Sequence, residues 1–190
     1  VGFHMAEQTD FSKIRFVNRL DRDTSGIVIM AKNQFIHHQL SEAMREKTID
    51  KTYIALVKGV VENDERLIDL PIDREDVDSI KRMVREDGKP CQTKIKVIKR
   101  FMDYTLLEVK LLTGRTHQIR VHLTHIGHSI VGDELYNEHS ELIDRQFLHC
   151  TQMAFKHPLT DEYIEVDADY KEDMNCCLEQ IGGISWEESL

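Results

Sequence analysis

Residues 92–112 read QTKIKVIKRFMDYTLLEVKLL and hold two runs in which apolar and polar side chains alternate. A period of two places successive side chains on opposite faces of a strand. The runs at 92–100 and 104–112 are separated by three residues, a connection short enough to join antiparallel neighbours. This stretch therefore predicts an antiparallel β-hairpin.

Further strands are expected on both sides of this hairpin. They are short apolar runs rich in β-branched residues, or runs bounded by polar segments, and lie at 13–17, 26–31, 53–57, 147–155 and 162–167. The polar, acidic stretch at 59–89 predicts a loop excursion without regular structure. No internal repeat or linker rich in Pro, Gly or Ser divides the chain.

Helices are expected in three places. Asn33 is a candidate N-cap for a helix at 34–46, where Ile36, Leu40 and Met44 recur every four residues. A second helix is expected to begin at Thr116 as its N-cap and to end at Gly127, and the acidic tail predicts a short third one. Strands with a few interspersed helices favour the α+β class: a largely antiparallel mixed β-sheet with flanking helices.

Composition places the chain among soluble globular domains. Of its 190 residues, 41% are hydrophobic and 31% charged, and no apolar run approaches the 18 residues or so that a membrane span requires. No basic-then-apolar leader is visible. The four cysteines show no CxxC spacing, which favours reduced thiols and a cytoplasmic location.

Charge is distributed unevenly along the chain. The formal net charge is −9, which by itself disfavours a polyanionic partner. Residues 91–130, however, carry seven bases and two acids, while residues 131–190 carry three bases and fifteen acids. A nucleic-acid partner is therefore compatible with the basic stretch, although composition does not predict one.

Four histidines in GRTHQIRVHLTHIGH (114–128) raise the question of a metal site. Ligands on one helix face need steps of three or four residues, but His117 and His122 are five apart, about 140° around the helix. No Glu accompanies them, and Arg115 and Arg120 would repel a cation. The spacing disfavours a metal, and hydrogen bonding under a loop is the simpler role for His122, His125 and His128.

A second charged cluster, NRLDRDTSG (18–26), lies between two apolar runs. Arg115 and Arg120, near the start of a predicted helix, are unfavourable against the helix dipole unless an anion lies nearby. Asp21 and Asp23 are candidate partners, and so is a phosphate. Lys94, Lys96, Lys99 and Lys110 are candidates for phosphate contacts, or simply solvated lysines.

Four segments, taken in order, resemble the RluA/RluD family of pseudouridine synthases. They are NRLDRDTSGIVIMAKN, KTYIALVKG, LLTGRTHQIRVHLTHIGHSIVGDELY and FLHCTQMAFKHP. The family shows HRLDxxTSG, KxYxA and GRTHQIRxHLxxxGxPIxGDxxY. Asn18 stands where many members have His, and Ser129 where Pro is usual. The resemblance implies a single catalytic domain over 1–190, N-terminally incomplete and without an S4 domain.

The resemblance implies an enzyme that isomerises specific uridines in structured ribosomal or transfer RNA. The N1–C1′ bond breaks, the base turns and C5 bonds to C1′, so no cofactor or metal is expected. The reaction needs an ionised carboxylate in a pocket that excludes water, and a neighbouring guanidinium keeps such a group charged. By motif position, Asp21 is that carboxylate and Arg120 its ion-pair partner.

The resemblance also assigns the remaining site residues. Tyr53 matches the active-site tyrosine, whose ring can pack on uracil. Because a uridine in a stem-loop must leave the stack, Arg19 is expected to fill the vacated space. Arg115, His117 and Gln118 are further candidates for substrate binding, whereas Asp23, Thr24 and Ser25 fit loop building.

Several alternatives stay open at this level. Asp21 could attack covalently or assist a proton abstraction that passes through a glycal. The chain could also be a catalytically impaired RNA-binding fragment of such an enzyme. We expect a monomer with no membrane association, and the sequence does not say which RNA or which uridine is the target.

Overall fold

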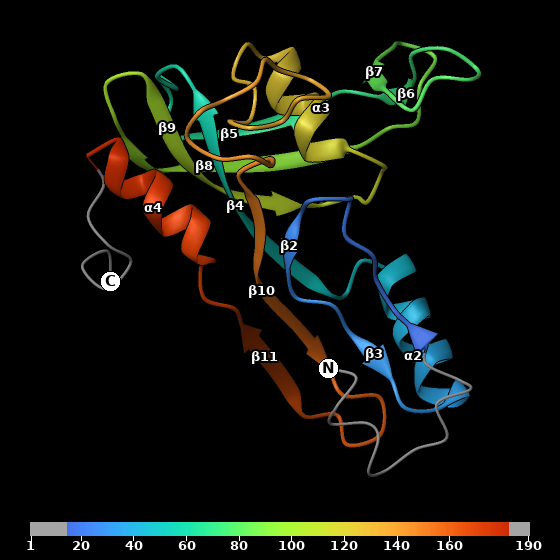
Figure 1. Ribbon diagram of the computed structural model, residues 1–190. Helices are drawn as coiled ribbons and strands as arrows, with labels where there is room; N and C mark the ends of the chain where they lie inside the picture. Colours follow the sequence, from blue (N-terminus) through green and yellow to red (C-terminus); the bar gives the residue numbers. More distant parts are fainter. Residues whose placement is uncertain (1–14, 183–190) are drawn as a thin grey trace.

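The structure is a computed structural model that describes residues 15–182. Its centre is a seven-stranded sheet (Figure 1). The strands are β2 (Ser25–Gly26), β4 (Asp50–Lys58), β5 (Glu65–Asp69), β8 (Gln92–Arg100), β9 (Tyr104–Leu111), β10 (Leu148–Lys156) and β11 (Tyr163–Asp167). Six of them follow the order β11-β10-β4-β9-β8-β5, and β2 pairs separately with β10.

Every pairing in this sheet is antiparallel except that of β2 with β10, which is parallel. Together with the three helices within residues 15–182, the sheet confirms the predicted α+β class. The hairpin that the alternation predicts is formed by β8 and β9, where Ile95 lies opposite Val109. Ile95 and Val109 are fully buried and Lys94 and Lys96 are exposed, because alternate side chains point to opposite faces.

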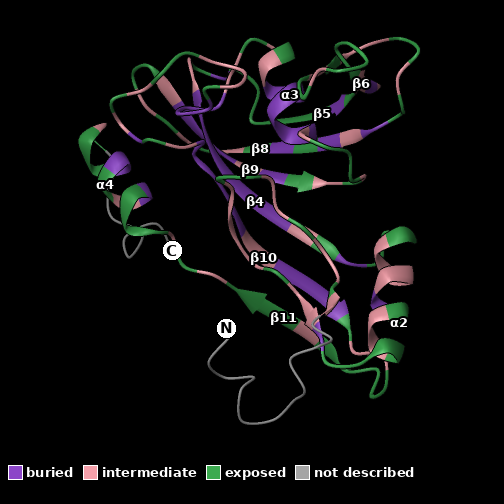
Figure 2. Cartoon of the chain, turned by 45° about the vertical axis from the view of Figure 1, so that its right-hand side comes forward, coloured by how far each residue is buried: buried purple, intermediate pink, exposed green. Residues whose placement is uncertain are grey.

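Strand β4 runs through the middle of the core. Its residues from Thr52 to Val57 are all buried, so both of its faces are covered (Figure 2). Tyr53 lies opposite Cys150 of β10 on one side and Val109 of β9 on the other. This central position fixes the direction of the Tyr53 side chain, which matters for the site described below.

The helices are α2 (Gln34–Arg45), α3 (Gln118–His125) and α4 (Glu172–Gln180). Asn33 caps α2 as predicted, since its side-chain oxygen accepts a hydrogen bond from the Ile36 N–H at 2.9 Å. The acidic tail forms α4, whose Met174, Cys177 and Leu178 enter the core.

The prediction of Thr116 as N-cap of α3 is wrong. His117 is the N-cap, it has φ 56°, and its side chain makes no capping hydrogen bond. This left-handed conformation is uncommon for a residue other than glycine. The structure around His117 must therefore hold it in place, and a local capping signal in the sequence does not reveal that. The helix ends at His125, two residues before Gly127.

Two further predictions about strands are corrected. The run at 26–31 is not one strand, because β2 ends at Gly26 and the separate β3 (Met30–Ala31) pairs with β1 (Arg15–Phe16). Residues 13–14 of the strand predicted at 13–17 lie outside the described residues. The stretch at 59–89 is not a loop, since it holds β5, β6 (Ile72–Arg74) and β7 (Arg82–Val84). In β5 only Ile68 is buried, so its apolar signal is weak.

Strands β6 and β7 form a small hairpin that projects from the body of the molecule beside α3 (Figure 1). We call residues 72–84 the arm. Elsewhere, the four cysteines carry free thiols, as predicted, and only Cys176 is exposed. Within residues 15–182, no helix is both long enough and apolar enough to span a membrane.

Candidate active site

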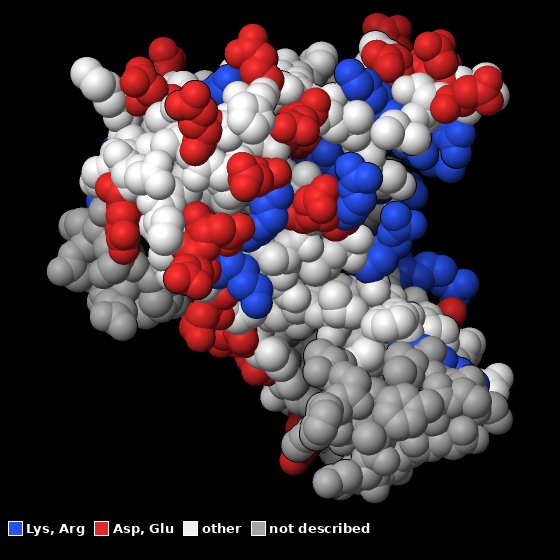
Figure 3. Space-filling view, in the orientation of Figure 1, with Lys and Arg blue, Asp and Glu red and all other residues white. Residues whose placement is uncertain are grey.

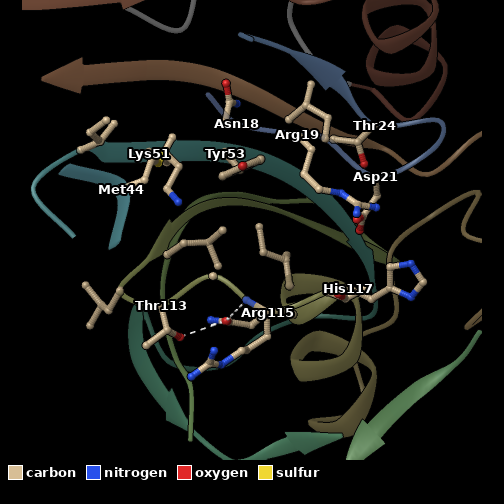
Figure 4. A pocket seen from close by; sticks show the side chains of 18 of the residues that line it. Asn18, Arg19, Asp21, Thr24, Met44, Lys51, Tyr53, Thr113, Arg115 and His117 are labelled. Carbon is tan, nitrogen blue, oxygen red and sulfur yellow. Dashed lines mark hydrogen bonds between the residues drawn. The ribbon is translucent and has the colours of Figure 1, made fainter. Parts of the chain in front are cut away.

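A cleft of about 610 Å³ opens between the α2 end of the molecule and the segment that leads into α3. Its walls come from residues 17–24, from the end of α2 and the start of β4, from residues 111–120, and from Leu148. Figure 4 shows Asp21 and His117 toward one end and Lys51 and Met44 toward the other. The cleft therefore brings together the charged loop, strand β4 and the third motif block.

Asp21 lies in a tight turn whose backbone the protein holds from several sides. The Thr24 N–H donates to the Asp21 carbonyl at 3.0 Å, and Asp23 adopts the left-handed conformation with φ 68°. The Gln146 amide donates to the Arg22 carbonyl at 2.7 Å and to the Thr24 hydroxyl at 2.8 Å. The loop-building roles expected for Asp23 and Thr24 agree with this geometry.

The two ends of this turn are also fixed. Asn18 accepts from the Ile29 N–H at 2.7 Å and donates to the Ile27 carbonyl at 3.2 Å, so it ties the strands on both sides of the loop together. The Ser25 hydroxyl lies 2.7 Å from Nδ1 of His149. Asp21 is consequently presented to the cleft by a rigid loop, with its side chain about one fifth exposed.

Gly26 closes the loop against β10 and allows a prediction. A Cβ at this position would lie 2.4 Å from the Cys150 carbonyl oxygen, and φ is +122°. We expect Gly26→Ala to lower the free energy of unfolding by about 3 kcal/mol or more, through backbone strain and displacement of β10. Urea denaturation measures the loss. Gly127→Ala is the matched control, because φ there is +87° but nothing lies within 4 Å; an equal loss in both variants would contradict the steric argument.

Arg120 connects the charged loop to α3. Its Nη1 lies 3.8 Å from Oδ2 of Asp21, so the predicted ion pair forms, but beyond hydrogen-bonding distance. Nε and Nη2 instead donate to the two carboxylate oxygens of Asp133, at 2.7 and 2.6 Å. The bidentate partner of Arg120 is therefore Asp133, and one face of the guanidinium remains directed toward Asp21.

The charges around Arg120 explain its state. Burial lowers the pKa of Arg120, but the hydrogen bonds and charge of Asp133, with a contribution from Asp21, outweigh burial and raise it. The guanidinium also lies over the Tyr136 ring, 5.0 Å from its centroid. Arg120 is thus a permanent positive charge fixed beside Asp21.

His117 and Tyr136 form a second layer next to this pair. Burial, reinforced by Arg120 and opposed by Asp21, lowers the pKa of His117, so the ring is neutral near pH 7. The Tyr136 oxygen accepts from the Arg82 N–H at 2.8 Å and lies 2.8 Å from Nδ1 of His117. A neutral ring can accept at Nδ1, so the Tyr136 hydroxyl can donate to His117. Through these two contacts Tyr136 ties the arm to the start of α3.

Tyr53 forms part of the cleft floor, as predicted from its motif. Burial, more than the adjacent Cys150 and Asp21, raises the pKa of Tyr53 far above its ordinary value. The phenol therefore stays protonated at any ordinary pH. Its hydroxyl can donate a proton, and its ring offers an apolar surface beside Asp21.

Gln118 and Arg115 differ in how far their side chains are already engaged. The Gln118 carbonyl oxygen accepts from the Thr113 hydroxyl and the Arg115 N–H, and its amide donates to Thr93 and to the Gln92 carbonyl. Both ends of the Gln118 side chain are thus engaged in hydrogen bonds within the protein, and its role in substrate binding stays a prediction. Arg115 and Arg19 line the cleft, where both could reach a bound molecule.

His122 and His128 are engaged in hydrogen bonds, the simpler of the two roles considered for these histidines. His122 is fully buried between the Thr93 hydroxyl and the Leu70 carbonyl, and His128 bonds to the Lys58 carbonyl. Among residues 15–182, no group of three or more His, Cys, Asp or Glu side chains is placed to hold a metal ion.

The cleft is strongly cationic. Among the lining residues within 15–182, one is acidic, Asp21, and six are basic: Arg19, Arg45, Lys47, Lys51, Arg115 and Arg120. In Figure 3, Lys and Arg gather around the hollow at the right-hand edge, while Asp and Glu are spread over the rest of that face. The candidate phosphate contacts Lys94, Lys96, Lys99 and Lys110 do not line the cleft.

Sequence reasoning missed Asp133, Tyr136 and the basic residues at the α2 end of the cleft. Asp133 and Tyr136 lie in the GDELY part of the third motif block, so the block itself was the available signal. Lys51 likewise opens the second block, KTYIALVKG. Arg45 and Lys47 lie outside the quoted segments and carry no such signal.

Comparisons with known proteins agree on one family. A family model described as RNA pseudouridylate synthase matches residues 5–125. An uncharacterised RNA pseudouridine synthase of Bacillus subtilis, YlyB, is 40% identical over 184 residues, covering 93% of this chain and 61% of that protein. Ribosomal large subunit pseudouridine synthase C of Vibrio parahaemolyticus is 40% identical over 162 residues, covering 82% of this chain and 51% of that protein.

A solved structure shows the same fold. Human RNA pseudouridylate synthase domain containing 1 superposes with a TM-score of 0.77 at 28% identity, over 88% of this chain and 74% of that one. The chain spans about 60% of the length of the first curated relatives it matches. The overall fold of this chain is therefore similar to the fold of that protein.

Proposed function

The chain belongs to the RNA pseudouridylate synthase family, and from this premise we propose that it isomerises uridine in RNA to pseudouridine. The observation that carries the proposal is Asp21, which among the described residues is the one carboxylate lining the cleft, beside six cationic side chains. A cationic cleft suits a polyanionic substrate, and a lone carboxylate beside a fixed guanidinium suits the reacting group.

In the proposed reaction, Asp21 is the catalytic carboxylate and Arg120 stabilises its charge. The N1–C1′ bond of the target uridine breaks, the uracil turns, and C5 bonds to C1′. The C5 proton leaves and N1 takes up a proton, so the product is an isomer of the substrate. Whether Asp21 attacks covalently or assists proton abstraction stays open. The Tyr53 ring packs on the uracil, and its protonated hydroxyl can donate to it.

Substrate access requires that the uridine leave its stack, at a cost of a few kcal/mol. We infer that Arg19, which lines the cleft near Asp21, occupies the space in the RNA that the base vacates. Arg115 and His117 contact the flipped nucleotide. The substrate is a stem-loop, because bases in a loop are more easily extruded.

The RNA class proposed for this chain is based on the name of one relative. One of them is a ribosomal large subunit pseudouridine synthase, and on that basis we propose ribosomal RNA as the substrate, with transfer RNA as the alternative. We further propose that the enzyme acts as a monomer in the cytoplasm, without a metal ion or organic cofactor.

The direct test uses uridine labelled with tritium at C5. Isomerisation replaces the C5–H bond with C5–C1′, so turnover releases tritium to water while the RNA keeps its mass. Release from ribosomal RNA lacking the modification, with pseudouridine formed in equal amount, is the expected result. Binding without release would favour the impaired RNA-binding fragment instead.

RNA binding should depend on salt despite the net charge of −9, because the cleft cations meet the phosphates. With about three to five phosphate contacts, affinity should fall about 15- to 130-fold between about 50 and 200 mM salt, at about −0.7 in slope per contact. Fluorescence anisotropy of a labelled stem-loop at several salt concentrations measures the slope. A flat response with measurable binding would mean that stacking, not charge, holds the RNA.

A further inference from the structure

Lys51 is a cation in the cleft to which the structure gives no anionic partner. It lies on β4 two residues before Tyr53, so its side chain leaves the same face of the strand. Figure 4 shows the Lys51 ammonium pointing into the cavity, at the end away from Asp21. A Cβ on Gly114 would lie 3.9 Å from its Nζ, so the ammonium is close to the opposite wall of the cleft.

Within residues 15–182, the surroundings of Lys51 supply no negative charge that balances its ammonium group. Among the described residues, the neighbouring group that raises the pKa of Lys51 is the Cys150 thiol and not a carboxylate. Burial outweighs this and lowers the pKa of Lys51, which means that the charged form is poorly solvated. Two lysines outside the cleft differ from Lys51, because Lys94 pairs with Glu65 at 2.9 Å and Lys58 with Glu138 at 3.6 Å.

A second lysine lines the same end. Lys47 follows α2 in the left-handed conformation with φ 61°, which directs the chain from the helix into β4. Arg45 also lines the cleft but is paired with Glu42. At this end the cleft thus presents two lysine ammonium groups, with the catalytic carboxylate at the other.

We propose that Lys51, assisted by Lys47, binds a backbone phosphate of the RNA strand next to the target nucleotide. The proposal rests on the proposed function, since it places the flipped uridine at Asp21 and the strand along the cleft toward α2. A phosphate meets the need of a half-buried ammonium better than water does, because it supplies the missing negative charge. Lysine binds phosphate as a point charge and needs no fixed orientation.

The test measures binding separately from turnover. In the Asp21→Asn protein, a labelled uridine-containing stem-loop is titrated at several salt concentrations by fluorescence anisotropy. We expect Lys51→Gln to weaken binding about tenfold at low salt and to reduce the salt slope by about 0.7. Lys51→Arg should retain most of the affinity at low salt and most of the salt slope, because arginine keeps the positive charge.

Lys96→Gln is the matched control. Lys96 is exposed on β8 opposite Glu108, which in turn lies opposite Ile54, so it occupies the sheet face away from Tyr53. Lys96→Gln should leave the affinity for the stem-loop and the slope of its salt dependence unchanged. An equal loss in Lys96→Gln and Lys51→Gln would overturn the assignment, and so would a loss in Lys51→Gln at every salt concentration with an unaltered slope.

A neutral linkage in the RNA identifies the phosphate. Stem-loops with a single uncharged methylphosphonate on the 5′ or the 3′ side of the uridine are compared with the unmodified RNA. At one of the two positions, the neutral linkage should weaken binding as much as Lys51→Gln does. Combining that linkage with Lys51→Gln should then weaken binding no further than either change alone. Additive losses at both positions would mean that Lys51 binds neither linkage, and would overturn the assignment.

These outcomes are distinct from failure of the proposed function. If wild-type protein released no tritium from any uridine RNA, isomerisation would be contradicted, yet coupling between Lys51 and one linkage would still be measurable. If turnover occurred without such coupling, the function would stand and the Lys51 subsite would not.

Discussion

Replacing Asp21 with asparagine is expected to abolish isomerisation, with a fall in kcat/KM of about 10⁴-fold or more. The amide has the same shape, but it can neither carry the negative charge nor act as a nucleophile or base. The fold should be unaffected, because the Asp21 side chain is partly exposed and the turn is held through its backbone. Tritium release and the urea midpoint measure the two quantities.

Asp23→Asn in the same loop is the control for this variant. Asp23 is an exposed carboxylate paired with Arg22 at 3.1 Å, and asparagine tolerates its left-handed conformation equally well. Its activity should stay within about twofold of wild type. Wild-type turnover in Asp21→Asn, or an equal loss in both variants, would remove Asp21 from its catalytic role.

Asp133→Asn is expected to lower the free energy of unfolding by about 3–5 kcal/mol. Asp133 and Arg120 are both nearly fully buried, and each carboxylate oxygen accepts one guanidinium N–H. An amide can accept only one of these bonds and leaves the buried Arg120 charge without its partner. Activity should fall as well, because Arg120 is no longer held beside Asp21.

Asp173→Asn breaks a pair of the same bidentate shape at the surface. Asp173 accepts from Arg145 at 2.6 and 2.9 Å, but both side chains are partly exposed. We expect a loss of about 1 kcal/mol or less there, because water solvates the separated charges. Urea denaturation of the two variants side by side tests the difference, and equal losses would mean that burial of the Arg120 pair carries no extra stability.

The fold class was predictable because its decisive elements are local. The β8–β9 hairpin shows its alternation within 21 residues, and α2 combines a cap at Asn33 with a four-residue apolar repeat. Each of these signals depends only on neighbours in sequence. The short strands β6 and β7 carry no comparable signal, because they are held by pairing with each other.

The missed details depend on partners far away in the chain. Gly26 ends β2 because it packs against Cys150, and the GIVIMA run gives no sign of that contact. His117 can cap α3 without a capping side chain because its ring is fixed at Tyr136. Contacts over such distances are set by the fold, and periodicity does not reveal them.

In the candidate site, too, some features were predictable from the sequence and others were not. The meeting of Asp21 and Arg120 was predicted, because both lie in motif blocks whose resemblance assigns them to one site. The stronger partner of Arg120 was not, since a carboxylate 13 positions further on in the sequence has no spacing rule that marks it. Lys51 was missed because a strand lysine is ordinarily a solvated one.

The anchoring of the Asp21 loop has a consequence during synthesis of the protein. Its hydrogen bonds from Gln146 and its contact with His149 join residues 122 to 124 positions apart. A nascent chain cannot form them until residues 146–149 have left the ribosomal exit tunnel, and such long-range contacts form late in folding. The Asp21 loop should therefore be among the last parts of the protein to order, so a partly translated chain should not yet hold Asp21 in place beside Arg120.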